Sequence, residues 1–290
     1  MATRIGVDLG GTKIEIIAMN DRRETLLRRR VPTPVGDYAK TVEAIGELVQ
    51  VAESELHVRA TVGVGTPGAP SPETQAIKNA NSTVLIGKPL QRDIEHRIGR
   101  EIRMTNDANC FILSEALDGA AQDARVAFGV ILGTGVGGGV SIDHTLVRGA
   151  NAIAGEWGHN PLPWPKPGEL PGPRCYCGKL GCIETWLSGA ALARERSQTA
   201  SEALALERYC DRLARSLATV INILDPDVVV FGGGVSNVSE LYPELTLALP
   251  AYVFSDTVQT SVRRAAHGDS SGVRGAALLW ESPSHESRGR

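Results

Sequence analysis

Apolar positions recur along the chain with two different periods, and the two periods alternate. Short apolar or alternating runs are typical of strands, and apolar residues that return every three or four positions are typical of helices. Strands are predicted at 4–9, 13–19, 25–32, 61–65, 101–105, 126–132 and 225–231 and near Val262, and helices at 38–56, 106–118, 190–224, 239–251 and 272–280. This interleaving predicts an α/β protein.

The first two predicted strands are joined by a turn of Gly10, Gly11 and Thr12. Glycine lets backbone N–H groups approach an anion closely, and threonine can donate its hydroxyl. Asp8, just before the turn, could hold a hydrated Mg²⁺ beside phosphate. Taken alone, the motif DLGGTK is also consistent with a hairpin that binds no ligand.

A second glycine-rich turn, GTGVGGGV at 133–140, follows the strand 126–132. A dinucleotide-binding fingerprint would open a helix at this point, but here a strand continues to Ile142. Two glycine-tipped hairpins suggest duplicated halves that clasp one phosphate chain between them. The triple glycine at 232–234 could let a flat ligand such as adenine lie on bare backbone, and a simple tight turn is the alternative.

Composition sets wider limits on the class of protein. The chain has 290 residues, of which 42% are hydrophobic and 22% charged, and its formal net charge is −3. These values fit a globular protein with two cores and argue against disorder and against nucleic acid as the main partner. No apolar run approaches the roughly 20 residues of a transmembrane helix, so we expect a cytoplasmic protein without a membrane partner.

Three of the five cysteines lie in one short segment, Cys175-x-Cys177-x4-Cys182, and His159 precedes them across a proline-rich loop. Three thiolates and one imidazole form a typical closed, tetrahedral site for structural zinc. The alternative is that these thiols are buried or form a disulfide, which a reducing compartment disfavours. Because two glutamates flank the predicted ligands, a zinc ion would fix the backbone that carries both.

Asp107 lies where the predicted strand 101–105 meets the predicted helix 106–118. Aspartate is favoured as a helix N-cap, but the carboxyl ends of strands also line clefts in α/β folds, where a general base acts. Both interpretations stay open. In the polar segment IKNANSTVLIG, Asn79 and Asn81 suit either the recognition of hydroxyl groups or the capping of turns.

In combination, these motifs resemble the ROK family of sugar kinases and repressors, which has an actin-like ATPase (ribonuclease H-like) fold. DLGGTK, NDAN, GTGVGGG, ExGH, CxCGxxGCxE and FGGG occur in the family's order between residues 4 and 280. NANSTVLIGKPL and AGEWGHNPLPW are similar to the bacterial fructokinase or mannofructokinase branch. Repressors of the family carry a helix-turn-helix before the first strand. Because only three residues precede the first predicted strand here, we expect this chain to lack that DNA-binding motif.

The resemblance implies an α/β protein of two lobes with a central cleft, and it assigns roles to particular residues. ATP and Mg²⁺ would be held by Asp8, Gly10, Gly11, Thr12, Lys13, Gly133, Thr134, Gly135, Gly137, Gly233 and Gly234. Sugar hydroxyls would be contacted by Asn81, Asn106, Asp107, Glu156, His159 and Glu184. Asp107 matches the family's general base, and the structural Zn²⁺ would be bound by His159, Cys175, Cys177 and Cys182.

The resemblance also implies an activity and an organisation. We expect ATP-dependent phosphorylation of the 6-hydroxyl of a hexose. The expected substrate is D-fructose, with D-mannose as a second one. We also expect the protein to form a homodimer. One lobe would comprise 1–118 and 267–290, and the other 119–266. A glucokinase or N-acetylhexosamine kinase would use the same polar residues. A sugar-responsive regulator without catalysis is the alternative from another class, and Asp107 with both phosphate loops argues against it.

Overall fold

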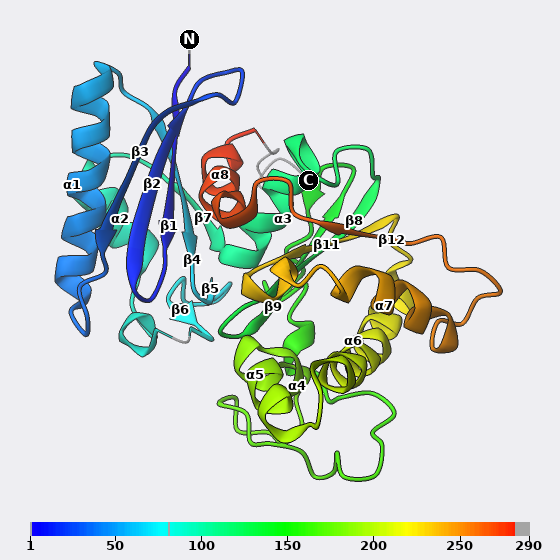
Figure 1. Ribbon diagram of the computed structural model, residues 1–290. Coiled ribbons are helices and arrows are strands. Elements are labelled where there is room, and N and C mark those ends of the chain that lie inside the picture. The colour runs from blue at the N-terminus through cyan, green and yellow to red at the C-terminus, as the bar shows by residue number, and fades with distance from the viewer. Residues whose placement is uncertain (1, 81, 282–290) are drawn as a thin grey trace.

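The computed structural model describes residues 2–80 and 82–281 and contains two five-stranded sheets of the same topology (Figure 1). The strand orders are β3-β2-β1-β4-β7 and β10-β9-β8-β11-β12. In each sheet the first three strands pair antiparallel and the last three pair parallel. This repetition confirms the duplicated halves that the two glycine-tipped hairpins suggested.

The first sheet is built almost entirely from the first hundred residues. Its strands are β1 (Arg4–Leu9), β2 (Lys13–Met19), β3 (Thr25–Pro32), β4 (Thr61–Thr66) and β7 (Arg103–Asn106). The strands of the second sheet are β8 (Val126–Leu132), β9 (Val136–Ile142), β10 (Thr145–Leu146), β11 (Val228–Gly232) and β12 (Ser261–Arg264). A separate two-stranded ribbon consists of β5 (Ala69–Pro70) and β6 (Ile77–Lys78).

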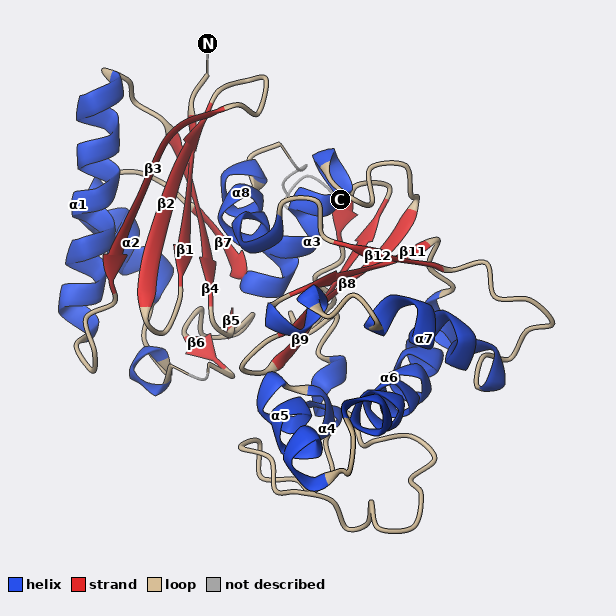
Figure 2. Cartoon of the chain, in the orientation of Figure 1, coloured by secondary structure: helices blue, strands red, loops and turns tan. Residues whose placement is uncertain are grey.

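Helices cover the outer faces of both sheets (Figure 2). Those beside the first sheet are α1 (Tyr38–Leu56) and α2 (Leu90–Ile98), and those beside the second are α4 (Ile183–Leu187), α5 (Gly189–Gln198), α6 (Glu202–Leu224) and α7 (Leu241–Ala248). In α1, Asp37 caps the first turn by accepting a hydrogen bond from the Lys40 N–H, and buried Ile45 and Val49 pack into the core of the first sheet. Apolar burial of this kind provides most of the stability of such helices.

Two helices, α3 (Asp107–Asp118) and α8 (Ser271–Leu278), lie between the sheets and share one apolar cluster with strands of both (Figure 1). They approach each other closely: a Cβ built on Gly275 would lie 1.7 Å from the Cys110 carbonyl oxygen. On the other side of α8, a Cβ on Gly63 of β4 would lie 1.9 Å from the Ala276 oxygen. These glycines let backbone pack against backbone, so α8 lies close to both α3 and β4.

Two sequence predictions need correction at element ends. The single helix predicted at 190–224 is two helices, because the chain leaves the helical conformation after Gln198 and Ser201 starts α6 by accepting the Leu204 N–H. The strand predicted from Asp225 begins at Val228, since Asp225 is left-handed (φ 47°) and ends α6.

Among the described residues, no helix is long and apolar enough to cross a membrane.

Candidate active site

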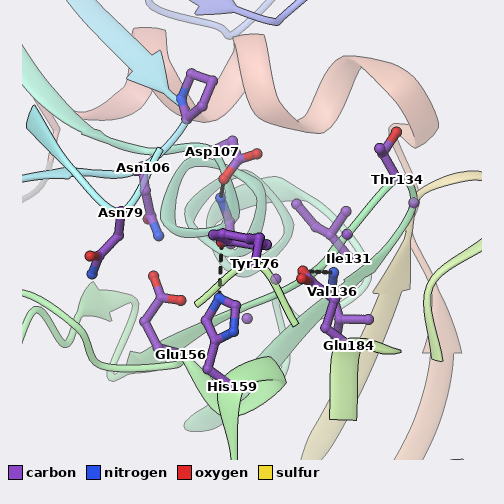
Figure 3. A pocket seen from close by; sticks show the side chains of 17 residues that line it. Asn79, Asn106, Asp107, Ile131, Thr134, Val136, Glu156, His159, Tyr176 and Glu184 are labelled. Atoms are coloured by element: carbon purple, nitrogen blue, oxygen red, sulfur yellow. Dashed lines mark hydrogen bonds between the residues drawn. The ribbon is translucent and has the colours of Figure 1, made fainter. Parts of the chain in front are cut away.

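A cavity of about 250 Å³ opens beside the N-terminus of α3, between segments that are far apart in the sequence (Figure 3). The loop before β5, the turn between β8 and β9, and the segment around Glu156 form its walls. Of the residues predicted from the sequence, the cavity brings together Asn106, Asp107, Gly133, Thr134, Gly135, Gly137, Glu156, His159 and Glu184. Residues predicted to bind sugar and residues predicted to bind phosphate therefore line the same cavity.

The sequence left two roles open for Asp107, helix N-cap and general base, and the structure gives the cap to Asn106. Asn106 is the N-cap of α3, and its side-chain oxygen accepts the Asn109 N–H at 3.0 Å. Asp107 is the first helical residue, and one of its oxygens accepts the adjacent Ala108 N–H at 2.8 Å. Because Asn106 satisfies the cap, the Asp107 carboxylate is free to face the cavity, where the positive end of the helix dipole favours its negative charge.

The carboxylates around the cavity are held in an environment that favours their protonated forms. The surrounding protein raises the pKa of Asp107, although the Ala108 N–H opposes this effect. Burial also raises the pKa of Glu156; the charges of Asp107 and Glu184 add to this shift, and His159 opposes it. Asp8 belongs to the same electrostatic group, since burial and then the charge of Asp107 raise its pKa to about 7. Such shifts mark groups placed for proton transfer or for binding a cation.

Glu184 joins the glycine turn to the cysteine segment. It is the second residue of α4, and its Oε2 accepts the Val136 N–H at 3.0 Å. A Cβ on Gly135 would lie 2.6 Å from the same Oε2, so the absence of a side chain there lets the glutamate reach the turn. Glu184 consequently orients the β8–β9 turn while it lines the cavity.

The four predicted zinc ligands converge. Their ligand atoms, from His159, Cys175, Cys177 and Cys182, all lie within 4.8 Å of one another. The Cys175 Sγ is 3.6 Å from the His159 Nδ1, and the Cys177 and Cys182 Sγ atoms are also 3.6 Å apart. Ligands placed tetrahedrally around zinc at its usual bond lengths are separated by about 3.6–3.8 Å. The residues therefore fit one structural zinc ion, with His159 binding through Nδ1.

The remaining ring nitrogen of His159 faces the cavity side. Its Nε2 lies 3.0 Å from the Tyr176 hydroxyl, and the two rings meet edge to face with centroids 5.1 Å apart. A hydrogen bond at the second nitrogen is the usual way in which a metal-binding histidine is oriented. His159 thus links the predicted zinc site to the cavity.

Three of the other predicted nucleotide-binding residues, Gly10, Gly11 and Gly234, line other hollows. Gly10 and Gly11 line a separate hollow of about 320 Å³ between the β1–β2 turn and residues 33–36. Gly234 lines a further one with Gly133, Thr134 and Ala190. Gly233 has a φ of 81°, and a Cβ there would come within 2.5 Å of the Leu132 oxygen, so this backbone position requires glycine. The turn at 133–134 therefore connects the central cavity to the Gly234 side.

Asn81, predicted to contact sugar hydroxyls, lies outside the described residues. Beyond the predicted site residues, the cavity is also lined by Pro67, Gly68, Asn79, Ala108, Ile131, Val136, Gly138 and Tyr176. Asn79 had a detectable signal, because it shares the polar segment of Asn81. Tyr176 lies between two predicted zinc ligands, and nothing in its spacing distinguished it from an ordinary loop residue.

Comparison with known proteins gives a consistent result. The model of the ROK family matches residues 4–282. An N-acetyl-D-glucosamine kinase of Salmonella gallinarum is 39% identical over 94% of this chain and 98% of its own length. The crystal structure of a ROK hexokinase from Thermus thermophilus matches with a TM-score of 0.82 at 32% identity, covering 95% of this chain and 97% of that one.

A second solved structure is a ROK family glucokinase from Streptomyces griseus in complex with glucose and AMPPNP. It matches with a TM-score of 0.80 at 26% identity and covers 96% of this chain and 99% of that one. These matches confirm the actin-like ATPase fold expected from the sequence. The curated relative is named for N-acetyl-D-glucosamine, so the prediction of fructose as substrate is not confirmed by it. Because the family model matches nearly the whole length of this chain, the chain belongs to the ROK family.

Proposed function

We propose that this chain is a sugar kinase that uses ATP to phosphorylate the 6-hydroxyl of a hexose. The position of Asp107 is the observation that carries the proposal. Its carboxylate faces a cavity that has the glycine turn of β8–β9 on one side and hydrogen-bonding side chains on the other. A general base must lie within reach of both the attacking hydroxyl and the phosphoryl group that is attacked. Kinases among the relatives, one of them in complex with a sugar and AMPPNP, add support.

The reaction needs positioning and charge neutralisation more than covalent chemistry. Asn106, Glu156 and Glu184 hydrogen-bond sugar hydroxyls, and Asp107 accepts the proton of the attacking hydroxyl. The backbone N–H groups at 134–135 of the β8–β9 turn face the phosphates, because those of Gly133 and Val136 are hydrogen-bonded within the protein. Mg²⁺, when bound, supplies charge neutralisation at the transferred group. Asp8 fits as the residue that would hold it, since a cation would stabilise the ionised form of its carboxylate, whose pKa is raised to about 7.

Two sugars are candidate substrates, and each has its own support. D-Fructose, with D-mannose beside it, follows from the similarity of NANSTVLIGKPL and AGEWGHNPLPW to the fructokinase branch. N-Acetyl-D-glucosamine is supported by a relative that is 39% identical to this chain and is named as a kinase of that sugar. The same carboxylates and amides would contact the hydroxyls of either sugar, so relative kcat/KM values decide between them.

Replacement of Asp107 by asparagine tests the proposal. Asp107→Asn keeps the size of the side chain and the acceptor for the Ala108 N–H, but it cannot take up a proton. We expect sugar binding and folding to be retained while kcat falls by about 10²–10⁴-fold, which is the usual contribution of a general base. The matched control is Asp256→Asn, which changes an exposed aspartate in a remote loop. Near-normal turnover in Asp107→Asn would contradict the assignment.

A further inference from the structure

A second cavity adjoins the candidate active site and has no part in the proposed reaction. Its volume is about 480 Å³, within the range of roughly 300–1,000 Å³ typical of small-molecule sites. One wall is β5 with the turn that follows it, at 69–75, and another is the loop at 148–152 that follows β10. Thr105 and Asn109, on either side of the Asn106–Asp107 pair, lie between them. None of the lining residues is shared with the active-site cavity.

Arg148 is the charged residue among the described residues that line this cavity. Its guanidinium forms no hydrogen bond or ion pair with any other residue in the described part of the chain. Burial lowers its pKa, and the nearby charge of Arg103 adds to that effect. Arginine nevertheless stays charged at physiological pH. A partly buried cation without a counter-ion is unfavourable, and an anion in the cavity would compensate it.

Neutral polar groups accompany the arginine. Thr105 accepts a hydrogen bond from Asn109 Nδ2 at 3.0 Å, and its own hydroxyl proton has no acceptor among the described residues. Gln75 is exposed to the cavity, and its Nε2 donates to the Pro72 carbonyl at 3.3 Å, which leaves the side-chain oxygen available. Met104 and Ala152 provide apolar surface. A cation together with hydroxyl and amide groups in the lining of one cavity suits a small, hydroxylated anion.

We propose that this cavity binds a small polyol that carries one phosphate or carboxylate group, with Arg148 contacting the anionic group. Guanidinium binds both groups through two parallel hydrogen bonds. Phosphorylated sugars and sugar acids share this chemistry. The occupant would join the two walls, which are already linked where Lys78 Nζ, on the strand β6 that pairs with β5, donates to the Asn151 carbonyl at 2.8 Å.

The site is also connected to the proposed active site through α3. The Asn109 N–H is the group that Asn106 caps, and Asn106 lines the active-site cavity. A ligand against Asn109 would therefore contact the helix turn that carries Asp107. Because the two cavities have separate walls, hexose and anion can occupy them together.

Isothermal titration calorimetry tests the proposal with three probes: glucose 6-phosphate, gluconate and the neutral polyol sorbitol. Titrations run with and without a saturating hexose, so that binding of a sugar phosphate in the active site is excluded. We expect one of the two anions to bind the wild-type protein in the presence of hexose, and sorbitol not to bind. The anion that binds identifies the phosphate or the carboxylate as the recognised group. Heat, not turnover, is the readout, so the result is independent of the kinase assay.

Variants of the arginine locate the site. Arg148→Met should weaken binding about tenfold or more, the loss expected for a hydrogen bond to a charged group, and Arg148→Lys should restore part of it. Arg92→Met, which removes a side chain that is 78% exposed on α2, is the matched control. Ala150→Glu, on the exposed part of the cavity wall, repels the anion without altering the core. Absence of binding by both anions, or equal affinity in the wild type, Arg148→Met and Ala150→Glu, would overturn the proposal.

Discussion

Two neighbouring side chains have different roles at the start of α3, and this difference is the basis of the proposed chemistry. Asn106 caps the helix, and Asp107 faces the cavity. The sequence NDAN contains both residue types but does not reveal which of them caps, because asparagine and aspartate are almost equally good N-caps. The backbone resolves the question, since Asn106 has extended dihedral angles (φ −72°, ψ 164°) and Asp107 is already helical.

The raised pKa of Asp107 predicts the acidic side of the pH profile. A general base must be ionised, and desolvation by the surrounding protein raises the pKa of this carboxyl above its ordinary value of 3.8. As pH falls, protonation should therefore remove turnover at a pH above about 4, the range of a free aspartate. The measurement is kcat/KM against pH, with thermal unfolding followed at each pH as a control. An acidic limb at or below about pH 4 would show that the carboxylate is not the titrating base.

At the scale of elements, the loop that carries His159 and the cysteine segment hold one side of the cavity in place. Cys182 immediately precedes α4, and Glu184 in its first turn accepts the Val136 N–H. His159, Cys175, Cys177 and Cys182 fit a zinc ion with distances close to those of a tetrahedral site. We propose that zinc orients Glu156 and Glu184 and takes no part in the transfer itself.

Zinc content and sugar affinity should therefore change together. We expect elemental analysis to find about one zinc ion per chain in protein purified under reducing conditions. Cys177→Ser should lower zinc occupancy and weaken sugar binding by about 10–100-fold before it affects the unfolding of the two sheets. Cys210→Ser, at a buried thiol of α6 outside the cluster, should retain the zinc. Unchanged sugar affinity after verified loss of zinc would refute the orienting role.

Elements with strong local signals were predictable, and elements whose ends depend on tertiary contacts were not. The hairpins at 4–19 and 126–142 follow from apolar runs around glycines. The break after Gln198 was missed, because the chain on both sides favours a helix and only the Ser201 cap marks the new start. Tyr176 was missed for a similar reason, since its contact with His159 exists only when the cysteine segment folds back on itself.

At the scale of the whole molecule, α3 and α8 join two sheets of the same topology, and the cavity of the candidate active site lies at one end of α3. We propose that the lobes divide as the sequence suggests, at 1–118 with 267–290 and at 119–266, and that they close over bound sugar to exclude water. We also propose that the protein is a homodimer. A monomer mass in light scattering at micromolar concentration would contradict this proposal.

The contact between α3 and α8 should be intolerant of even one added methyl group. Gly275→Ala would place a Cβ 1.7 Å from the Cys110 carbonyl oxygen, so the two helices would have to separate. We expect a loss in the free energy of unfolding of at least about 1–3 kcal/mol, typical of overpacking. Gly272→Ala, on the same helix but with no atom nearer than 3.7 Å, is the control and should be nearly neutral. Equal unfolding midpoints in denaturant for the two variants would contradict this account of the packing.

The most direct test of the proposed activity is sugar-dependent release of ADP from Mg-ATP. Fructose, mannose, glucose, N-acetylglucosamine and N-acetylmannosamine are compared by kcat/KM, with Asp107→Asn measured beside the wild type. We predict turnover by the wild type with at least one of these sugars, fructose or N-acetylglucosamine foremost, and its loss in Asp107→Asn. Sugar binding without ADP release from the wild type would contradict the kinase assignment and favour a sugar-responsive regulator.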